Sequence, residues 1–378
     1  MSSSDTYVQT VSDSKSFWKK ALKLPHLWIE LTERCNNNCI HCYINQPESD
    51  VNASSREINT SFIKDVLDQA CELGCLRVTF TGGEPLLRPD LTEIYLYARE
   101  KGLLITLFTN GRLLDESWMK MFREIPPGRP IELTTYGMTV ETYDRVTRKP
   151  GAFKEFKCAI GLLKENHIPF TVRMAVLNAN KSETGLYEKW VREMENQPQP
   201  MYVTALSLRV RRDNPERNET IRNQRINLDK VMQLLYDTSD HSEVAIDFCR
   251  DFSGFPGTKL FNCGWGKDPA VDAYGRVQGC LLLRHPGFVY DLKIGTLKDA
   301  VENFFSIHRE RLVTNSEYLE KCGNCSLFGF CEQCPAHSYM ENGTLDTPVE
   351  YLCCLAHSHS EHLKQLHDGQ NTLQNLVS

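Results

Sequence analysis

Three cysteines near the N-terminus have a spacing that suits a metal cluster. Cys35, Cys39 and Cys42 lie within the segment TERCNNNCIHCY, directly after an apolar segment at 27–33. Structural iron–sulfur sites normally have four cysteine ligands. Three thiolates would leave one metal ion open to a further ligand, which is also what separates catalytic from structural zinc sites. The same residues allow a zinc site that is completed by His41 or by a distant residue.

A glycine-rich turn is the second candidate site. Gly82, Gly83, Glu84 and Pro85 follow an apolar and β-branched segment at 76–80. Two adjacent glycines let the backbone approach a ligand closely, and the Glu84 carboxylate can accept hydrogen bonds from an ammonium group. Gly-Gly-Glu alone is often only a turn. Its position one strand and one helix after the three cysteines makes it a stronger signal.

Together the two motifs resemble those of the radical SAM superfamily. The resemblance implies that Cys35, Cys39 and Cys42 bind a [4Fe–4S] cluster whose open iron chelates the amino and carboxylate groups of S-adenosylmethionine. It also implies that the Gly-Gly-Glu motif holds the methionyl ammonium group. In that superfamily an aromatic residue often precedes the third cysteine, whereas His41 stands there in this chain.

The elements predicted around these motifs form a partial barrel. Short apolar segments predict six strands, at 27–33, 76–80, 103–108, 130–136, 168–176 and 201–208. Helical patterns separate them, and strands that alternate with helices indicate a parallel sheet. We therefore expect an α/β fold, a partial (β/α)6 TIM-like barrel over residues 27–240, after an N-terminal extension at 1–26. Catalytic loops should lie at the carboxyl ends of its strands.

Polar residues on the later strands are weaker candidates for binding the same cofactor. Asn110 follows the third strand, Thr134 lies at the end of the fourth, and Arg173 lies within the fifth. The resemblance places such residues near the ribose or the carboxylate of the cofactor. An unpaired buried arginine would be costly, so Arg173 pairs either with a ligand carboxylate or with a protein carboxylate. Thr134 also fits simple β-propensity.

The chain changes character after about residue 240. Glycine and cysteine become frequent, a hairpin is predicted at 270–279 with its turn at Tyr274-Gly275, and one helix is predicted at 296–305. We expect this part to lack a large apolar core and to gain stability from metal sites.

The C-terminal cysteines resemble those of the SPASM domain, which extends radical SAM enzymes and binds auxiliary clusters. The domain would occupy 241–360, followed by a tail at 361–378. The resemblance implies an outer cluster on Cys322, Cys325, Cys331 and either Cys353 or Cys354. It implies an inner cluster on Cys263, Cys280 and Cys334, whose fourth position is taken by Cys249 or left open. The spacing from Cys331 to Cys334 is one residue shorter than the family pattern, and C-x2-C pairs also allow two zinc sites.

Other cysteines, histidines and arginines are given structural roles. Cys71, Cys75 and Cys158 lie in or beside predicted helices and are expected to be buried as small apolar residues. His357, His359 and His362 are expected on a solvated helix face. The arginine-rich stretch at 209–225 is either solvated or a dock for an acidic peptide.

The composition narrows the classes of function. The chain has 378 residues and fifteen cysteines, an odd number that argues against a complete disulfide framework. Its net charge of −6 gives no indication of nucleic-acid binding. It has neither an apolar run of membrane-spanning length nor the apolar core of a signal peptide. We therefore expect a cytoplasmic protein with no membrane or nucleic-acid partner.

The resemblance implies a function but not a substrate. An electron would pass to S-adenosylmethionine, and the resulting 5′-deoxyadenosyl radical would take a hydrogen atom from the substrate. A ribosomally made peptide, to be crosslinked or otherwise matured, is the first expectation. A small molecule, altered by epimerisation, decarboxylation or another biosynthetic step, is the alternative, because only the extension at 1–26 precedes the first strand. One or two auxiliary clusters and an electron donor such as flavodoxin or ferredoxin are implied, and a non-enzymatic zinc-binding adaptor is the remaining alternative.

Overall fold

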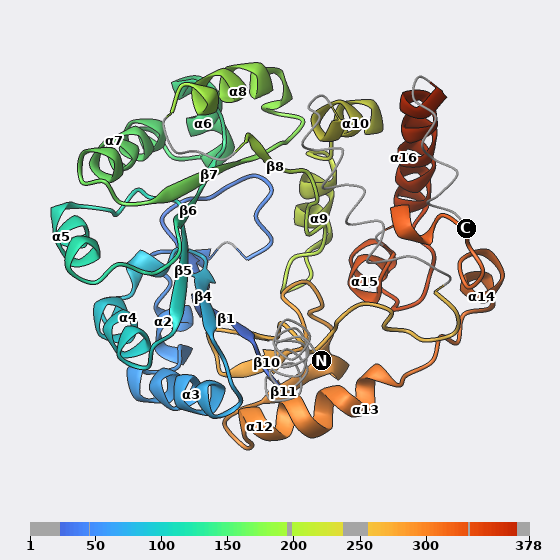
Figure 1. Ribbon diagram of the computed structural model, residues 1–378, viewed down its shortest axis with the longest axis horizontal. Coiled ribbons are helices and arrows are strands. Elements are labelled where there is room, and N and C mark those ends of the chain that lie inside the picture. The colour runs from blue at the N-terminus through green and yellow to red at the C-terminus, as the bar shows by residue number, and fades with distance from the viewer. Residues whose placement is uncertain (1–22, 45, 195–198, 237–255, 332, 369–378) are drawn as a thin grey trace, which may run out of the picture.

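Parallel strands form the framework of the N-terminal half, as the sequence predicted. The computed structural model describes residues 23–44, 46–194, 199–236, 256–331 and 333–368. The barrel strands are β1 (His26–Thr32), β4 (Arg77–Gly82), β5 (Leu104–Thr109), β6 (Ile131–Thr135), β7 (Phe170–Ala175) and β8 (Met201–Val203). They are hydrogen-bonded in chain order, and each pair is parallel. Figure 1 shows them curving into an open barrel with helices on the outside, which confirms the predicted partial barrel.

Most helices of this half cover the outer face of the strands, because one side of each strand is apolar. The helices are α2 (Val51–Arg56), α3 (Thr60–Glu72), α4 (Leu91–Glu100), α5 (Glu116–Glu124), α6 (Val140–Thr147), α7 (Ala152–Glu165), α8 (Thr184–Arg192), α9 (Pro215–Arg222) and α10 (Leu228–Tyr236). On β6, Ile131, Leu133 and Thr135 are buried, whereas Glu132 and Thr134, which alternate with them, are partly exposed. This alternation places polar side chains on the inner face of the barrel. None of the helices in the described ranges is both long and apolar enough to cross a membrane.

The last barrel strand is shorter than predicted. We expected a strand over 201–208, but β8 ends at Val203. Beyond it, Leu208 packs against Ile221 and Met340, and the Arg209 guanidinium donates to the Tyr339 carbonyl at 3.0 Å. Contacts with the C-terminal part therefore draw the segment away from the sheet.

The C-terminal half continues the sheet of the barrel across its first strand. Its strands are β9 (Ala270–Val271), β10 (Arg276–Gln278) and β11 (Val289–Asp291), and β9 pairs in parallel with β1. The predicted hairpin is present as the antiparallel pair β9–β10, and Gly275 in its turn has φ +83°, which favours glycine. The helices here are α12 (Leu297–Asp299), α13 (Phe305–Arg309), α14 (Ser316–Lys321), α15 (Pro335–Asn342) and α16 (Glu350–Asp368). A π-helical turn at Ala300–Phe304 joins α12 to α13, so the predicted helix extends to Arg309.

The expectation that this half lacks a large apolar core was wrong. Trp265, Phe288 and Phe305 are each at most 2% exposed and belong to the same core cluster as the barrel. Phe261 stacks on Trp265 with ring centroids 4.5 Å apart. These aromatic residues lie mostly in loops and short turns, so no helical or strand periodicity indicated that they form a core.

Candidate functional site

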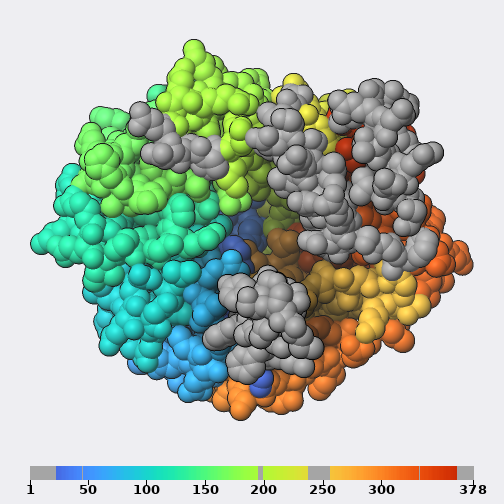
Figure 2. Space-filling view, in the orientation of Figure 1, coloured from blue at the N-terminus to red at the C-terminus, as the bar shows by residue number. Residues whose placement is uncertain are grey.

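The three N-terminal cysteines lie in one loop at the carboxyl end of β1. The two-residue strand β2 (Arg34–Cys35) begins the loop and pairs with β3 (Gln46–Pro47) at its end. Inside the loop, the backbone N–H of Cys42 donates to the Cys39 carbonyl at 3.1 Å. The molecular surface shown in Figure 2 is hollowed between the barrel and the C-terminal part.

Long-range contacts hold the backbone of this loop. Arg217 donates to the carbonyl oxygens of Cys39 and Cys42 at 2.6 and 3.1 Å. The backbone N–H groups of Asn38 and Ile40 donate to carbonyls at the end of α6, at 2.9 and 3.0 Å. Protein groups outside the loop therefore hold its backbone in place, which is the arrangement that a preorganised site needs.

The environment of the three thiols fits a metal cluster. Burial raises the pKa of Cys35 to about 12, and nearby charges, including that of Cys42, raise it as well. Burial likewise raises the pKa of Cys39 well above its ordinary value. Thiols in such a place stay neutral unless a cation stabilises the thiolate, and iron supplies that charge. Within the described residues, no three side chains of the Cys, His, Asp or Glu type gather closely enough for a single metal ion.

Amide groups surround Cys35. The Asn37 N–H lies 3.4 Å from the Cys35 sulfur, and the Asn110 side-chain amide lies 3.9 Å from it. Asn110 also donates to the Asn36 side-chain oxygen at 2.7 Å. Hydrogen bonds to ligating sulfur tune the potential of iron–sulfur clusters. Sequence reasoning named Asn110 but missed Asn36 and Asn37, although the Asn-Asn-Asn run inside the motif was a visible signal.

The glycine-rich turn is joined to the cysteine loop backbone to backbone. The Gly83 N–H donates to the Thr32 carbonyl at 2.7 Å, and the Glu84 N–H donates to the Arg34 carbonyl at 2.8 Å. A Cβ at Gly83 would lie 2.2 Å from the Arg34 carbonyl oxygen, and one at Gly82 would lie 2.3 Å from that of Thr32. Only glycine fits at either position. The two motifs are adjacent because the neighbouring parallel strands β1 and β4 both end there.

The Glu84 carboxylate is buried and is held by protein donors. It accepts hydrogen bonds from the Thr109 hydroxyl at 2.7 Å and from the backbone N–H groups of Asn110 and Leu86 at 2.8 and 3.0 Å. Burial raises its pKa to about 6, although these donors oppose the shift. Because a carboxylate can accept about four hydrogen bonds, one acceptor position is left for a ligand ammonium group. Pro85 begins the short 3-10 helix at Pro85–Leu87 that Glu84 caps.

Thr134 and Arg173 are register partners on β6 and β7. The Arg173 guanidinium pairs with Glu132 at 2.8 Å, and 37% of its side chain remains exposed. Of the two partners expected for Arg173, the structure has the protein carboxylate. Binding of a ligand by either residue stays a prediction.

The expectation of a solvated arginine-rich stretch was wrong for Arg211, whereas the dock for an acidic peptide stays a prediction. Arg211 is buried and pairs with Glu30 and Glu33, which are each 1% exposed. Arg212 pairs with Glu33 at 2.8 Å, and Arg284 from the C-terminal half pairs with Glu30 at 2.5 Å. Burial would raise the pKa of Glu33, but the arginines outweigh it and lower this pKa to about 2. Arg211 and Arg212 therefore pair within the barrel, and Arg284 joins the C-terminal half to the same buried carboxylates.

The structure places the C-terminal thiols in two groups. Burial and, to a smaller extent, the thiols of Cys322, Cys325 and Cys353 raise the pKa of Cys331 to about 12. Similarly, burial with smaller effects from Cys280 and Cys263 raises the pKa of Cys334 to about 12.

We call the first set, Cys322, Cys325, Cys331 and Cys353, the outer thiols. We call the second set, Cys263, Cys280 and Cys334, the inner thiols. Cys249 lies outside the described residues. None of the cysteines within those residues forms a disulfide.

Two of the structural roles assigned from the sequence need correction. Cys158 is exposed on α7, not buried, whereas Cys75 is buried as expected. His359 is not on a solvated face, because it packs against Tyr236 of α10 and lies 2.6 Å from the Tyr236 hydroxyl. His357 is exposed as expected.

Comparisons with known proteins agree with these motifs. Residues 29–191 match the Radical SAM superfamily. The chain is 33% identical over 154 residues to an AdoMet-dependent heme synthase of Methanosarcina barkeri. This match covers 41% of this chain and 43% of that protein. The chain is 34% identical over 154 residues to a PqqA peptide cyclase of Gluconobacter oxydans. This match covers 41% of this chain and 42% of that protein. The matches thus span less than half the length of these curated relatives.

A solved structure shows the same fold over most of the chain. It is native anSMEcpe with bound AdoMet and Cp18Cys peptide, with a TM-score of 0.63 and 18% identity. The match covers 90% of this chain and 98% of that one. At this identity the likeness establishes the fold, and it extends through the cysteine-rich C-terminal half.

Proposed function

Because residues 29–191 belong to the radical SAM superfamily, we propose that this chain is an enzyme that cleaves S-adenosylmethionine reductively. Cys35, Cys39 and Cys42 would hold the [4Fe–4S] cluster. The observation that carries the proposal is the junction of two motifs, in which the Gly83 and Glu84 N–H groups donate to the backbone carbonyls of Thr32 and Arg34, just before the cysteine loop. When bound, the cluster and S-adenosylmethionine supply a 5′-deoxyadenosyl radical that removes a hydrogen atom from the substrate.

The residues of the chain prepare the site for this chemistry. The Glu84 carboxylate, fixed by Thr109 and Asn110, offers its free acceptor position to the ammonium group of the cofactor. Arg217 holds the loop carbonyls and so keeps the thiols at a fixed distance from Glu84. Trp28 and Phe108, whose rings meet edge to face at 5.4 Å, add an apolar surface on the inner side of β1 and β5 that helps to exclude water.

The outer and inner thiols would hold two auxiliary clusters. Four outer thiols can fill every cluster position, whereas the three inner thiols need Cys249 or a further ligand. We propose that these clusters accept an electron from the substrate or hold it in place. An external donor such as flavodoxin or ferredoxin would supply the first electron. The reducing conditions that this chemistry needs favour the cytoplasm.

A ribosomally made peptide is the proposed substrate. The PqqA peptide cyclase relative and the peptide-bound structure with the same fold support this class. A small molecule is the second candidate, because the relative named as a heme synthase has nearly the same identity over the same length.

The proposal is tested by assaying cofactor cleavage in anaerobically purified protein. With dithionite and S-adenosylmethionine, the wild-type chain should release 5′-deoxyadenosine, and Cys39→Ala should reduce this to background and remove about four iron atoms per chain. Cys158→Ala, which changes an exposed thiol on α7, is the matched control and should keep both properties. A colourless wild-type protein that contains zinc and no iron would contradict the proposal.

A further inference from the structure

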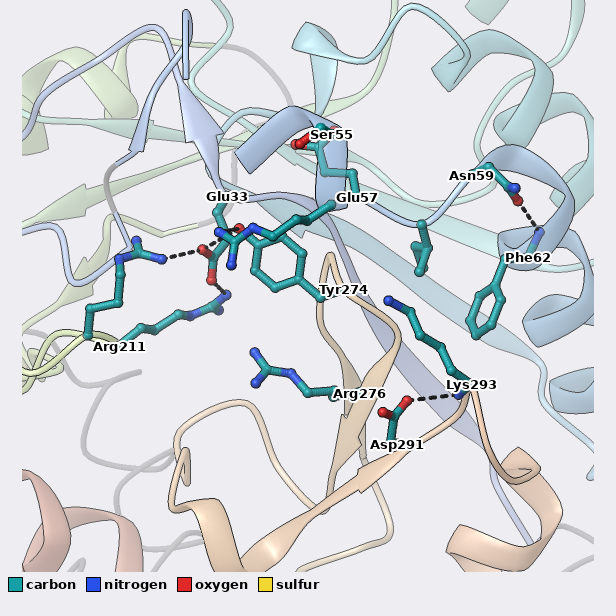
Figure 3. Close-up of a pocket in the computed structure, with 13 residues that line it drawn as sticks. Glu33, Ser55, Glu57, Asn59, Phe62, Arg211, Tyr274, Arg276, Asp291 and Lys293 are labelled. Atoms are coloured by element: carbon teal, nitrogen blue, oxygen red, sulfur yellow. Dashed lines mark hydrogen bonds and ion pairs between the residues drawn. The ribbon is translucent and has the colours of Figure 1, made fainter. Parts of the chain in front are cut away.

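A pocket of about 680 Å3 lies between the barrel and the β9–β10 hairpin (Figure 3). Its walls come from three separate segments of the chain: residues 55–62, residues 211–212 and residues 274–293. Glu33 completes the lining. No cysteine is among the lining residues, so the pocket is distinct from the proposed cluster sites.

Basic side chains outnumber acidic ones in this pocket. The basic residues are Arg56, Arg211, Arg212, Arg276 and Lys293, and the acidic ones are Glu33, Glu57 and Asp291. This local excess contrasts with the net charge of −6 of the whole chain. The pocket is therefore a place where an anion gains local attraction that the molecule as a whole does not offer.

Most of these charges are already paired. Arg211 and Arg212 bind Glu33. Glu57 binds Arg34 at 2.9 Å, and Arg276 binds Asp272 at 2.7 Å. These groups shape the pocket wall, but their charges are largely neutralised by their partners.

Arg56 and Lys293 are different. Both are exposed, and neither takes part in an ion pair within the part of the chain that the structure describes. The Arg56 guanidinium lies over the Tyr274 ring at 4.7 Å and donates to the Asn52 carbonyl at 3.1 Å and to the Tyr274 hydroxyl at 3.4 Å. These contacts fix the cation, and its remaining N–H groups can bind an anion. Asp291 is also without an ion pair there, and it accepts a hydrogen bond from the Lys293 backbone N–H at 2.9 Å.

An apolar wall lies beside these cations. Ile58 is 5% exposed and Phe62 is partly buried. A Cβ added at Gly275 would lie 3.0 Å from Ile58 and 3.3 Å from Phe62, so the hairpin turn packs on this wall. Cations next to a partly exposed aromatic ring suit a peptide that carries acidic and apolar side chains together. Free phosphate would make no use of the apolar wall.

We propose that this pocket binds an acidic, apolar-flanked segment of the peptide substrate, through Arg56 and Lys293. The inference rests on the proposed function, since it names a recognition site for that substrate class. Glu33 lines the pocket and lies two positions before Cys35 in the chain. A segment held there is anchored beside the thiol loop, which raises the effective concentration of the rest of the peptide at the barrel.

The test measures binding of a defined probe to the anaerobically purified full chain. The probe is a fluorescein-labelled peptide of alternating glutamate and leucine, and its glutamine–leucine counterpart is the uncharged control. The double variant Arg56→Gln/Lys293→Gln should bind the acidic probe about tenfold more weakly, which is about 1.4 kcal/mol, because two exposed ion pairs with the probe are lost. Lys120→Gln/Lys154→Gln removes the same charge from exposed positions on α5 and α7 and should bind like the wild type.

The outcomes separate the pocket from the cofactor chemistry. Equal binding of the two probes, an unchanged affinity in the Arg56/Lys293 variant, or equal competition by inorganic phosphate would each overturn the inference. Cleavage of S-adenosylmethionine without substrate should be unaltered in that variant, because neither residue touches the thiol loop. If the wild type failed to cleave the cofactor but bound the probe as expected, the proposed function would fail and the peptide-binding pocket would stand.

Discussion

The barrel and the C-terminal half both gather thiols, but they support them in different ways. In the barrel, Cys35, Cys39 and Cys42 share one loop that is tied to β4, α6 and Arg217. In the C-terminal half, the outer thiols come from α14 and the turns that follow it and from α16, and the inner thiols come from loops far apart in the chain. The first set is prepared by the surrounding fold, whereas the second set depends on several short elements that meet.

The two regions also differ in what surrounds the sulfur atoms. Asn110 and Glu84 lie beside the barrel loop and have acceptor or donor groups that a cofactor could use. The four outer thiols are sufficient to fill a cluster by themselves. In the proposed function, the incomplete set of thiols beside polar groups at the barrel mouth would be the reactive centre, and the complete set would serve electron transfer or structure.

Removal of one outer thiol should have the largest effect on the difference between the two regions. Cys331→Ala should lose about four iron atoms per chain and should lose substrate turnover. Its cleavage of S-adenosylmethionine without substrate should remain close to wild type, because the barrel loop is intact. Iron analysis and 5′-deoxyadenosine assays, run beside Cys39→Ala, would check this.

The same experiment can identify the fourth outer ligand. Cys353 contributes to the pKa of Cys331, whereas Cys354 is not among the groups that do so. Cys353→Ala should therefore lose the same iron as Cys331→Ala, and Cys354→Ala should not. Loss of cofactor cleavage in Cys331→Ala with the barrel cluster still present would show that the two regions do not divide the work in this way.

The buried ion pairs around Glu30 and Glu33, which Arg284 of the C-terminal half also joins, should have the next largest effect, and this effect is on stability. Arg211→Met leaves two buried carboxylates, Glu30 and Glu33, with less compensation, and breaking such a pair typically costs about 3 kcal/mol or more. Arg212→Met also removes a partner of Glu33, but 46% of the Arg212 side chain is exposed, so about 1 kcal/mol or less is expected. Urea unfolding of the two variants measures the difference, and equal destabilisation would contradict the buried role of Arg211.

The sequence revealed the parts of the site that are local. The Cys35–Cys42 spacing and the Gly82–Glu84 turn are short patterns, and the strand–helix alternation placed them at one edge of the sheet. The pairing of β9 with β1 could not be foreseen, because each contributes only two residues to it. Nor could the partners of Arg211, since Glu30 and Glu33 lie far away in the chain and no periodicity links them.

One error could have been avoided by reading periodicity more strictly. On α7 the buried residues are Ala152, Phe156, Ala159, Ile160 and Leu163. Cys158 falls outside this stripe, so its exposure was visible in the helical pattern. The residue type alone suggested that Cys158 is buried, but its position on α7 places it on the exposed face of the helix.

The smallest predicted effect is a pH dependence of the stability of α16. Burial, with a smaller contribution from His362, lowers the pKa of His359 on α16 to about 4, against an ordinary value of 6.5. Because the folded state binds this proton less readily than the unfolded state, stability is full above the ordinary pKa and falls as the pH drops toward 4. At about pH 5.5 the loss is on the order of 1 kcal/mol.

Acid should therefore loosen the contact of α16 with Tyr236 of α10, and with it the position of Cys353. Hydrogen exchange of α16 and β1 between about pH 7 and about pH 5.5 would measure this, since exchange reports local opening separately for each element. His359→Gln, which cannot take up the proton, should remove the pH-dependent part of the α16 signal and leave β1 unchanged. His357→Gln, at an exposed position on the same helix, should keep the full pH dependence, and a loss of it there would assign the effect to another group.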